Sequence, residues 1–153
     1  MARRDRTANT ALMQALRILD QAVAAMVEHA RAAAPHECCG LLLGRAGEPD
    51  QVDEARPAAN VHPAPATHFE IDPQALIDAH RAARAGGPAV LGYYHSHPSG
   101  PAAPSATDRA LAAGDGRVWG IVAQGEVTFW RDEPHGFDPL ARSRALPTNG
   151  PRG

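Results

Sequence analysis

The sequence predicts an α/β fold in which a mixed sheet is flanked by helices. Two observations lead to this class. Short apolar runs bounded by glycine or proline, typical of buried strands, alternate with segments whose apolar residues recur every three or four positions, which is typical of helices. In chain order the segments read α-β-β-α-β-α-β-β. Such an order favours helices packed on the faces of a sheet.

Length and composition agree with one domain. The chain has 153 residues, of which 44% are hydrophobic and 21% are charged, and this suits a single hydrophobic core. We place the domain at residues 1–131. From Arg131 onward, proline, glycine and charged residues dominate and the apolar periodicity ends. Residues 132–153 are therefore predicted to be an irregular or disordered tail.

The first helix is predicted over residues 9–33, because apolar residues spaced three and four apart form one stripe on a helix. Pro35 ends it. The stripe consists of Leu12, Leu16, Leu19, Val23, Met26 and Ala30.

Three extended segments follow. The apolar run of residues 38–44 is bounded by glycine and predicts a buried strand. Residues 51–60 predict a second strand, which Pro57 weakens near its end. After a connection rich in proline and alanine, residues 69–71 predict a short edge strand.

The remaining elements are marked by their ends. Asp72 and Pro73 suit the N-cap and first position of a helix, which residues 86–88 terminate. A strand over residues 89–94 leads into residues 95–98. Ser105 begins a short helix with a Ser-x-x-Asp capping pattern. Residues 118–123 and 127–130 predict a hairpin that turns at Gly125.

Composition excludes several classes of function. The net charge of −2 and the pI near 6.4 favour neither a nucleic-acid partner nor an anionic membrane. No apolar run reaches the roughly 18 residues of a membrane span. Polar residues interrupt the N-terminal apolar stretch, unlike an export signal, so a cytoplasmic location is expected. Cys38 and Cys39 are adjacent and cannot join distant parts of the fold, which excludes a secreted domain built on disulfides.

The segment from His95 to Asp108 carries the chemistry. At the end of a strand, His95 and His97 are two residues apart and point to the same face. A proline-rich loop then turns the chain, so that the next helix can bring Asp108 back toward them. Two histidines and one carboxylate leave the fourth position of a tetrahedral zinc open, as in catalytic sites.

Simpler explanations exist for each part of this pattern. A His-x-His pair alone is weak support for a metal site. Ser105 and Asp108 by themselves form an N-cap box. Capping and metal binding would compete for the Asp108 carboxylate, although Ser105 could still cap through its hydroxyl.

The whole combination resembles the JAMM, or MPN+, metallopeptidases of the Mov34/MPN/PAD-1 family. Their signature is an upstream Glu, then His-x-His-Pro, then Ser-x-x-Asp. Here these are Glu37, residues 95–98 and residues 105–108, and the ten residues between His97 and Asp108 match the family spacing. Residues 35–44, Asn60 and residues 69–73 extend the similarity, which covers about residues 35–130.

The resemblance implies a cytidine deaminase-like fold, with zinc held by His95, His97 and Asp108. It implies that Glu37 is the general base for a zinc-activated water, and that Ser105 donates a hydrogen bond to the oxyanion. Cytidine deaminases themselves bind zinc through a Pro-Cys-x-x-Cys motif, which this sequence lacks. Neither Cys38 nor Cys39 is expected to be a ligand or a nucleophile, and His36 is expected at the surface.

The chain is most similar in extent to stand-alone prokaryotic members of the family. For these, the resemblance implies hydrolysis of a peptide or isopeptide bond after the C-terminal Gly-Gly of a ubiquitin-like, β-grasp sulfur-carrier protein. The alternative is a non-catalytic MPN scaffold. Such scaffolds typically lack metal ligands, whereas all five signature side chains are present here.

Overall fold

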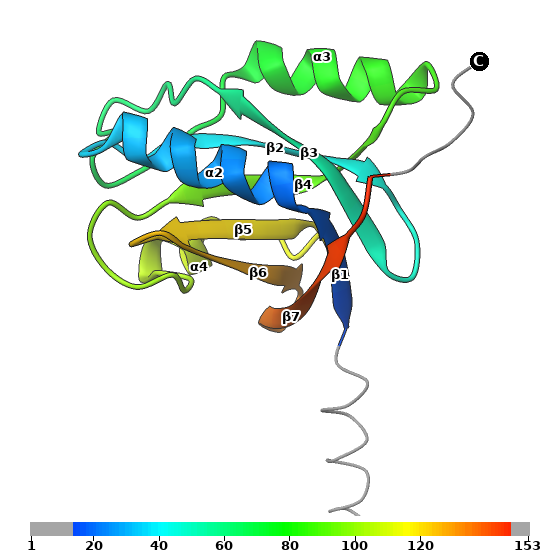
Figure 1. Ribbon diagram of the computed structural model, residues 1–153. Helices are drawn as coiled ribbons and strands as arrows, with labels where there is room; N and C mark the ends of the chain where they lie inside the picture. Colours follow the sequence, from blue (N-terminus) through cyan, green and yellow to red (C-terminus); the bar gives the residue numbers. More distant parts are fainter. Residues whose placement is uncertain (1–13, 148–153) are drawn as a thin grey trace, which may run out of the picture.

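The computed structural model describes residues 14–147, in which seven strands form a closed barrel in the order β1-β3-β2-β4-β5-β6-β7 (Figure 1). The barrel is mixed, because β1 runs parallel to β3 and β7, and β4 runs parallel to β5, while the other pairs are antiparallel. The elements are β1 (Ala15–Leu19), α2 (Asp20–Ala33), β2 (Cys39–Arg45), β3 (Asp50–Ala58), α3 (Pro73–Arg84), β4 (Ala89–Ser96), α4 (Ala106–Leu111), β5 (Val118–Ala123), β6 (Glu126–Glu133) and β7 (Gly136–Ala145).

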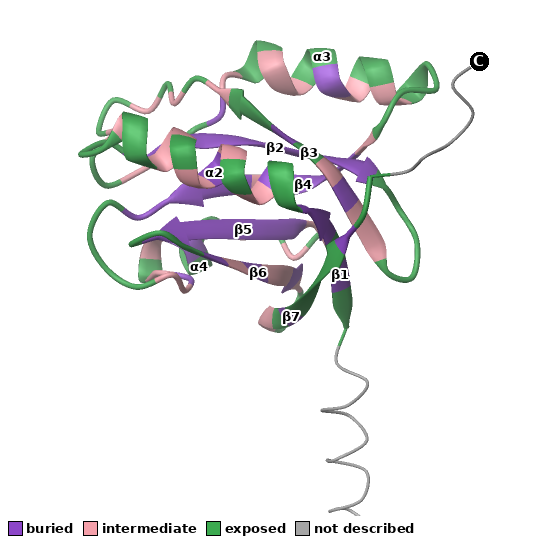
Figure 2. Ribbon diagram, viewed as in Figure 1, coloured by how far each residue is buried: buried purple, intermediate pink, exposed green. Residues whose placement is uncertain are grey.

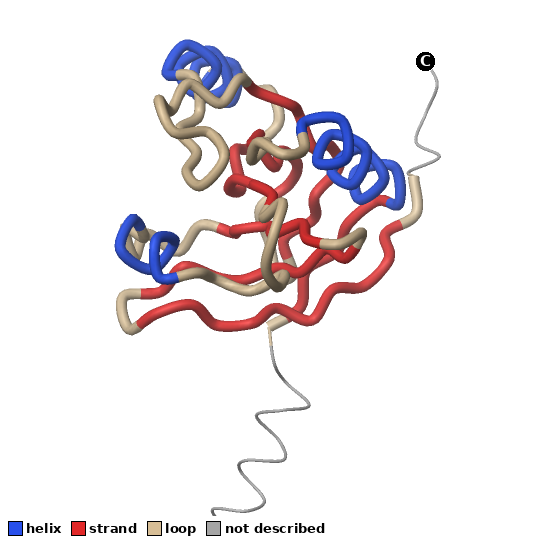
Figure 3. Tube along the Cα trace, turned by 90° about the vertical axis from the view of Figure 1, so that its left-hand side faces the viewer, coloured by secondary structure: helices blue, strands red, loops and turns tan. Residues whose placement is uncertain are grey.

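Two apolar cores lie on opposite faces of the strands, because successive strand side chains alternate between faces. On one face α2 packs through Met26 against a core that includes Leu42 and Tyr94. On the other face α3 packs through Ala79 against a core that includes Leu41 and Leu43. Figure 2 shows the central strands as the most buried part of the molecule, and Figure 3 shows helices on both sides of them. The predicted fold class, a mixed sheet flanked by helices, is confirmed.

The predicted first helix is wrong over residues 15–19, which form β1. Leu16 and Ile18 are buried while Ala15 and Arg17 are exposed, so the segment also has the period of two that suits a strand. Strand pairing decides between the two patterns: β1 pairs with β3 on one side and with β7 on the other. The helix α2 keeps the second half of the stripe. Residues 9–13 lie outside the described part of the chain.

The predicted irregular tail is also wrong over most of its length. Residues 136–145 form β7, which lies between β6 and β1 and closes the barrel. A domain boundary at residue 131 would therefore cut β6. The strand was missed because only Leu140 and Ala145 are buried in it and because Pro139 interrupts it. Pro139 is tolerated because pairing with β1 begins only at Ala141. Residues 148–153 lie outside the described residues.

The other predicted elements are confirmed within a few residues. Asp72 caps α3 by accepting a hydrogen bond from the backbone N of Gln74 at 3.1 Å. The β5–β6 hairpin turns at Gln124 and Gly125, whose positive φ angles of 53° and 77° suit a two-residue hairpin turn. The predicted edge strand at residues 69–71 is reduced to one bridge between Ile71 and Asn60.

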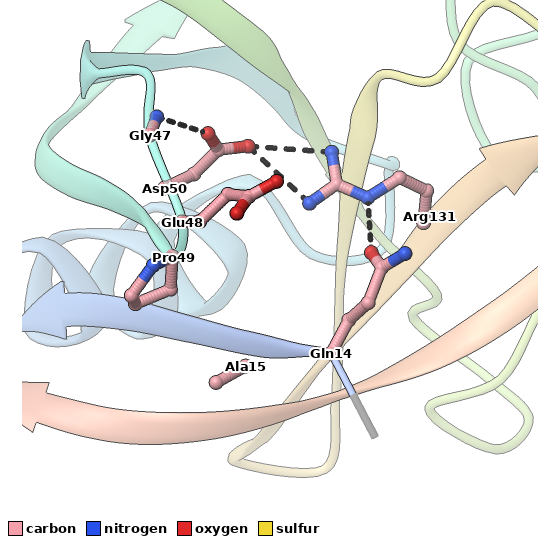
Figure 4. A pocket seen from close by; sticks show the side chains of 7 residues that line it. All are labelled: Gln14, Ala15, Gly47, Glu48, Pro49, Asp50 and Arg131. Atoms are coloured by element: carbon pink, nitrogen blue, oxygen red, sulfur yellow. Dashed lines mark hydrogen bonds and ion pairs between the residues drawn. The ribbon is translucent and has the colours of Figure 1, made fainter. Parts of the chain in front are cut away.

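Arg131, which pairs with Val118 at the start of β5, joins several elements (Figure 4). Its guanidinium donates to Asp50 Oδ2 from two nitrogens at 3.3 Å, to Gln14 Oε1 at 2.8 Å and to the Gly116 carbonyl at 2.9 Å. These contacts tie β6 to β3 and to the start of β1. No helix within residues 14–147 combines the length and the apolar character needed to cross a membrane.

Candidate metal centre

Three side chains singled out by the sequence, His95, His97 and Asp108, meet at the end of β4. Each offers one nitrogen or oxygen, and these atoms all lie within 4.8 Å of one another. His95 Nε2 is 3.2 Å from His97 Nε2 and 3.0 Å from Asp108 Oδ1, and His97 Nε2 is 3.1 Å from Asp108 Oδ2. All three residues are buried. Asp108, which follows His97 by 11 positions, is therefore brought back to the two histidines.

The spacing of these atoms fits a tetrahedral ion. Ligand atoms bound to zinc at about 2.0–2.1 Å in tetrahedral geometry lie about 3.3 Å from one another. The two histidine Nε2 atoms are 3.2 Å apart, close to this value, and they lie 3.0 Å and 3.1 Å from different oxygens of Asp108. Two imidazoles and one carboxylate are also a donor set that divalent metals of this kind use. The group can therefore hold a metal ion.

Strand pairing places the two histidines. His95 lies in β4 between Cys39 of β2 and Ile121 of β5. Its ring stacks on Phe69 at 4.3 Å between centroids and meets the edge of Trp119 at 5.7 Å. These contacts leave the His95 ring little freedom to rotate.

His97 is oriented by the proline-rich loop that follows it. Its backbone N donates to the Val122 carbonyl at 2.8 Å, and its Nδ1 lies 2.8 Å from the Pro101 carbonyl. Since a carbonyl only accepts, Nδ1 carries a proton, and Nε2 faces the ligand group. In the neutral ring that a metal ion requires, Nε2 would carry the lone pair. The loop is in turn held by Thr128, whose hydroxyl donates to the Ala102 carbonyl at 2.7 Å.

Asp108 caps α4 and faces the histidines at the same time. Ser105 Oγ accepts from the Asp108 backbone N, and the Ser105 backbone N donates to Asp108 Oδ2, both at 3.0 Å. Asp108 Oδ1 faces His95 while Oδ2 faces His97. The cap and the histidines thus meet at one carboxylate, whose Oδ2 is shared between the Ser105 backbone N and His97.

The charges of the group are set by burial and by these hydrogen bonds. Burial raises the pKa of Asp108, but the hydrogen bonds from His95 and His97 outweigh it and hold the pKa far below its usual range. Burial lowers the pKa of His95. The hydrogen bond with Asp108 raises the pKa of His97. Asp108 is thus an anion at neutral pH, as a metal ligand must be.

Glu37 lies beside this group without being part of it. It precedes β2 by two residues and has 8% of its surface exposed. Burial raises the pKa of the Glu37 carboxyl to about 7, while the charge on His97 lowers it and that on Asp108 raises it. A carboxyl that titrates near neutral pH can both take up and release a proton.

Cys38, Cys39 and His36 are not among the three residues of the ligand group. Cys38 and Cys39 are buried free thiols on the two opposite faces, and burial raises the pKa of both. His36 is exposed, as expected. Trp119 packs against the edge of His95.

Two residues that hold the site were missed by the sequence analysis. Thr128 anchors the loop after His97, as described above. Asp132 is 1% exposed, and its carboxylate accepts from the backbone N of Ala113 at 3.0 Å and of Gly114 at 3.1 Å. It thereby holds the segment that follows α4. A charged residue in a predicted loop or tail carries no local signal of such a contact.

Comparisons with known proteins show the family of the chain. A family model described as prokaryotic homologues of the JAB domain matches residues 19–133. The chain is 36% identical over 102 residues to the desampylase of Haloferax volcanii, a match that covers 64% of this chain and 73% of that protein. It is 45% identical over 75 residues to a probable TtuB-protein conjugate cleaving protease of Thermus thermophilus, covering 49% of this chain and 48% of that protein. The match thus spans about half of the Thermus relative.

A solved structure shares the fold. The solution structure of a protein from Desulfitobacterium hafniense superimposes with a TM-score of 0.77 at 31% sequence identity. The match covers 88% of this chain and 95% of the Desulfitobacterium protein. The similarity therefore extends over nearly the whole of both chains.

Proposed function

Because the chain belongs to the family of prokaryotic homologues of the JAB domain, we propose that it is a zinc-dependent peptidase of the JAMM type. His95, His97 and Asp108 hold the zinc, Glu37 is the general base and Ser105 binds the oxyanion. The observation that carries the proposal is the convergence of three buried ligand atoms beside a buried carboxyl with a pKa raised to about 7. Zinc, when bound, supplies a Lewis acid that makes a water acidic near neutral pH.

Glu37 moves the protons of the reaction. A carboxylate that ligated the metal would lose basicity, so the base must be a separate residue, and Glu37 is outside the ligand group. Glu37 takes a proton from the attacking water and later delivers it to the leaving amine. Its raised pKa suits both steps, because the carboxyl binds the proton firmly enough to take it and loosely enough to give it away.

In this proposal Ser105 stabilises the tetrahedral oxyanion. Its Oγ already accepts the Asp108 backbone N–H, which leaves the hydroxyl hydrogen as a donor. A donor held by a helix cap needs no reorganisation when charge develops on the substrate oxygen. The cap and the donor role are therefore compatible in one hydroxyl group.

The proposed substrate is a ubiquitin-like β-grasp carrier, cut after its C-terminal Gly-Gly at a peptide or isopeptide bond. The name of the Thermus relative, which describes cleavage of protein conjugates, supports this class of substrate. A folded carrier cannot reach buried ligands, but a flexible tail can. Gly-Gly before the scissile bond has no side chains to hinder its approach to the metal.

We expect the chain to bind one zinc ion, with an affinity that falls as the pH falls. Zinc needs His97 neutral, and the pKa of His97 is raised above 6.5 by Asp108, so proton competition begins above that pH. The pKa of His95 is lowered, so just below neutrality only one proton competes. The logarithm of Kd should then rise by about one per pH unit. Competition with a chromophoric chelator between about pH 6 and pH 8 measures this slope.

The matched control is His135→Ala, which removes an exposed histidine paired with Asp138. This variant should keep one zinc per chain and the same slope. The proposed ligands would be contradicted if the chain, purified without chelator, took up no zinc. They would also be contradicted if its affinity for zinc did not change with pH.

Cleavage should occur directly after Gly-Gly in a β-grasp carrier that has extra C-terminal residues. Replacing the second glycine of the carrier by leucine should lower kcat/KM by at least about tenfold, because the side chain obstructs the approach to the metal. Intact mass before and after incubation with the zinc-loaded chain gives the bond that is cut. Equal cleavage of the leucine carrier, or of unrelated unfolded peptides, would contradict the carrier as the substrate. It would not contradict the peptidase activity itself.

A further inference from the structure

The backbone of Glu37 is held from both sides by the segment that follows β3. Glu37 precedes β2, which begins at Cys39. Its backbone N donates to the Pro65 carbonyl at 2.7 Å, and its carbonyl accepts from Asn60 Nδ2 at 3.0 Å. The position of Glu37 is therefore set by residues 60–65 rather than by the hydrogen-bond ladder of the barrel.

Asn60 uses its whole side-chain amide for this segment. Its Nδ2 donates to the carbonyls of Glu37 and His68, each at 3.0 Å. Its Oδ1 accepts from the backbone N of His62 at 3.1 Å and of Glu70 at 3.0 Å. With two carbonyls on one side and two N–H groups on the other, the amide orientation is fixed by chemistry. A carboxylate at this position would have no donor for the two carbonyls.

The residue after Glu37 is anchored independently. The backbone N of Cys38 donates to Ser96 Oγ at 2.8 Å, and the backbone N of Ser96 donates to the Cys38 carbonyl at 3.1 Å. Cys38 therefore stays attached to β4. Without the bond from Asn60, Glu37 is held by the single bond from its own backbone N to the Pro65 carbonyl. A displacement of about 1 Å at a reacting group can lower turnover by about 10²-fold.

We propose that Asn60 is the positioning residue for Glu37. It fixes the Glu37 backbone, and thereby sets where the carboxylate stands relative to His95, His97 and Asp108. The role rests on the proposed function, in which Glu37 is the base. Asn60 makes no hydrogen bond to the three proposed ligands. It also bonds the backbone of His68 and Glu70, on either side of the Phe69 that stacks on His95, so zinc stoichiometry is measured alongside turnover to separate the two routes.

The first test needs neither metal nor substrate. Asn60→Asp keeps the acceptor for His62 and Glu70 but loses both donors, so the rest of the segment stays anchored. Amide hydrogen exchange by NMR on the metal-free chain should show faster exchange at Glu37, with His62 and Glu70 protected as before. Unchanged exchange at Glu37 in Asn60→Asp and Asn60→Ala would overturn the proposal.

The second test is a double-mutant cycle on turnover. Asn60→Ala should lower kcat by about 10–10²-fold with zinc stoichiometry kept. In a Glu37→Gln background the same change should have almost no further effect on kcat. The base that Asn60 positions is already absent in that background. An equal loss in both backgrounds, or loss of zinc, would show that Asn60 acts elsewhere.

The matched control is Gln51→Ala, which removes a side-chain amide of β3 that is bonded to Asp53 Oδ1 at 2.8 Å. It should change neither the exchange at Glu37 nor kcat. Failure of the proposed function is distinguishable. If Glu37→Gln alone had normal turnover, Glu37 would not be the base, while the exchange experiment would still decide whether Asn60 holds it.

Discussion

Replacing Glu37 by glutamine should lower kcat by about 10²–10⁴-fold while the chain keeps its zinc, because general-base catalysis contributes about that factor. Glutamine has nearly the shape of glutamate but cannot take a proton from the attacking water. Glu37 is buried and lies outside the ligand group, so its loss leaves the three metal ligands in place. Turnover on a tail-extended carrier and zinc content by metal analysis of the same sample give the two quantities.

His97→Ala is the comparison that makes this result specific. It removes a ligand and the hydrogen bond to the Pro101 carbonyl, so both zinc and turnover should be lost. If Glu37→Gln kept near-normal turnover, the base would have to be another residue. If it lost its zinc, Glu37 would instead be needed for the metal.

Ser105→Ala should lower kcat by about 10²–10³-fold with zinc retained, because it removes an oxyanion donor. The same change also removes the N-cap of α4, in which Ser105 Oγ accepts from the Asp108 backbone N. Loss of a cap costs about 1 kcal/mol of stability. The two roles differ in what they predict, since a cap alone affects the fraction folded and an oxyanion donor affects the folded enzyme.

Asp72→Ala is the matched control, because Asp72 caps α3 in the same way through the backbone N of Gln74. It should lose a similar amount of stability, measured by denaturant unfolding, with kcat unchanged. Normal kcat in folded Ser105→Ala would return Ser105 to the role of a cap.

The short-range features of this protein were readable from the sequence. His95 and His97 were expected on one face because they are two apart at the end of a strand, and their ring nitrogens do lie 3.2 Å apart. The helix caps at Asp72 and Ser105 and the hairpin turn at Gly125 were also expected, and all are present. Each depends on residues within a few positions of one another, where propensity and hydrogen bonding act locally.

The signature residues could be listed together before their contacts were known. Glu37 was selected by its place before an apolar run and by resemblance, and its raised pKa is a property that only burial provides. The sequence also left capping and metal binding as competitors for Asp108. In the structure the two carboxylate oxygens face different histidines, and one of them also accepts from the Ser105 backbone N.

The sequence by itself determined the α/β class, the paired histidines, the caps and the candidate ligand set. Each of these was predicted from the spacing of residue types along a short segment of the chain. Only the tertiary structure decided that residues 15–19 and 136–145 are strands, since a strand is stabilised by partners far away in the chain. It likewise decided the anchoring of Glu37 by Asn60, 23 positions away. A side-chain amide gives no sign in sequence of the distant carbonyl that it will bind.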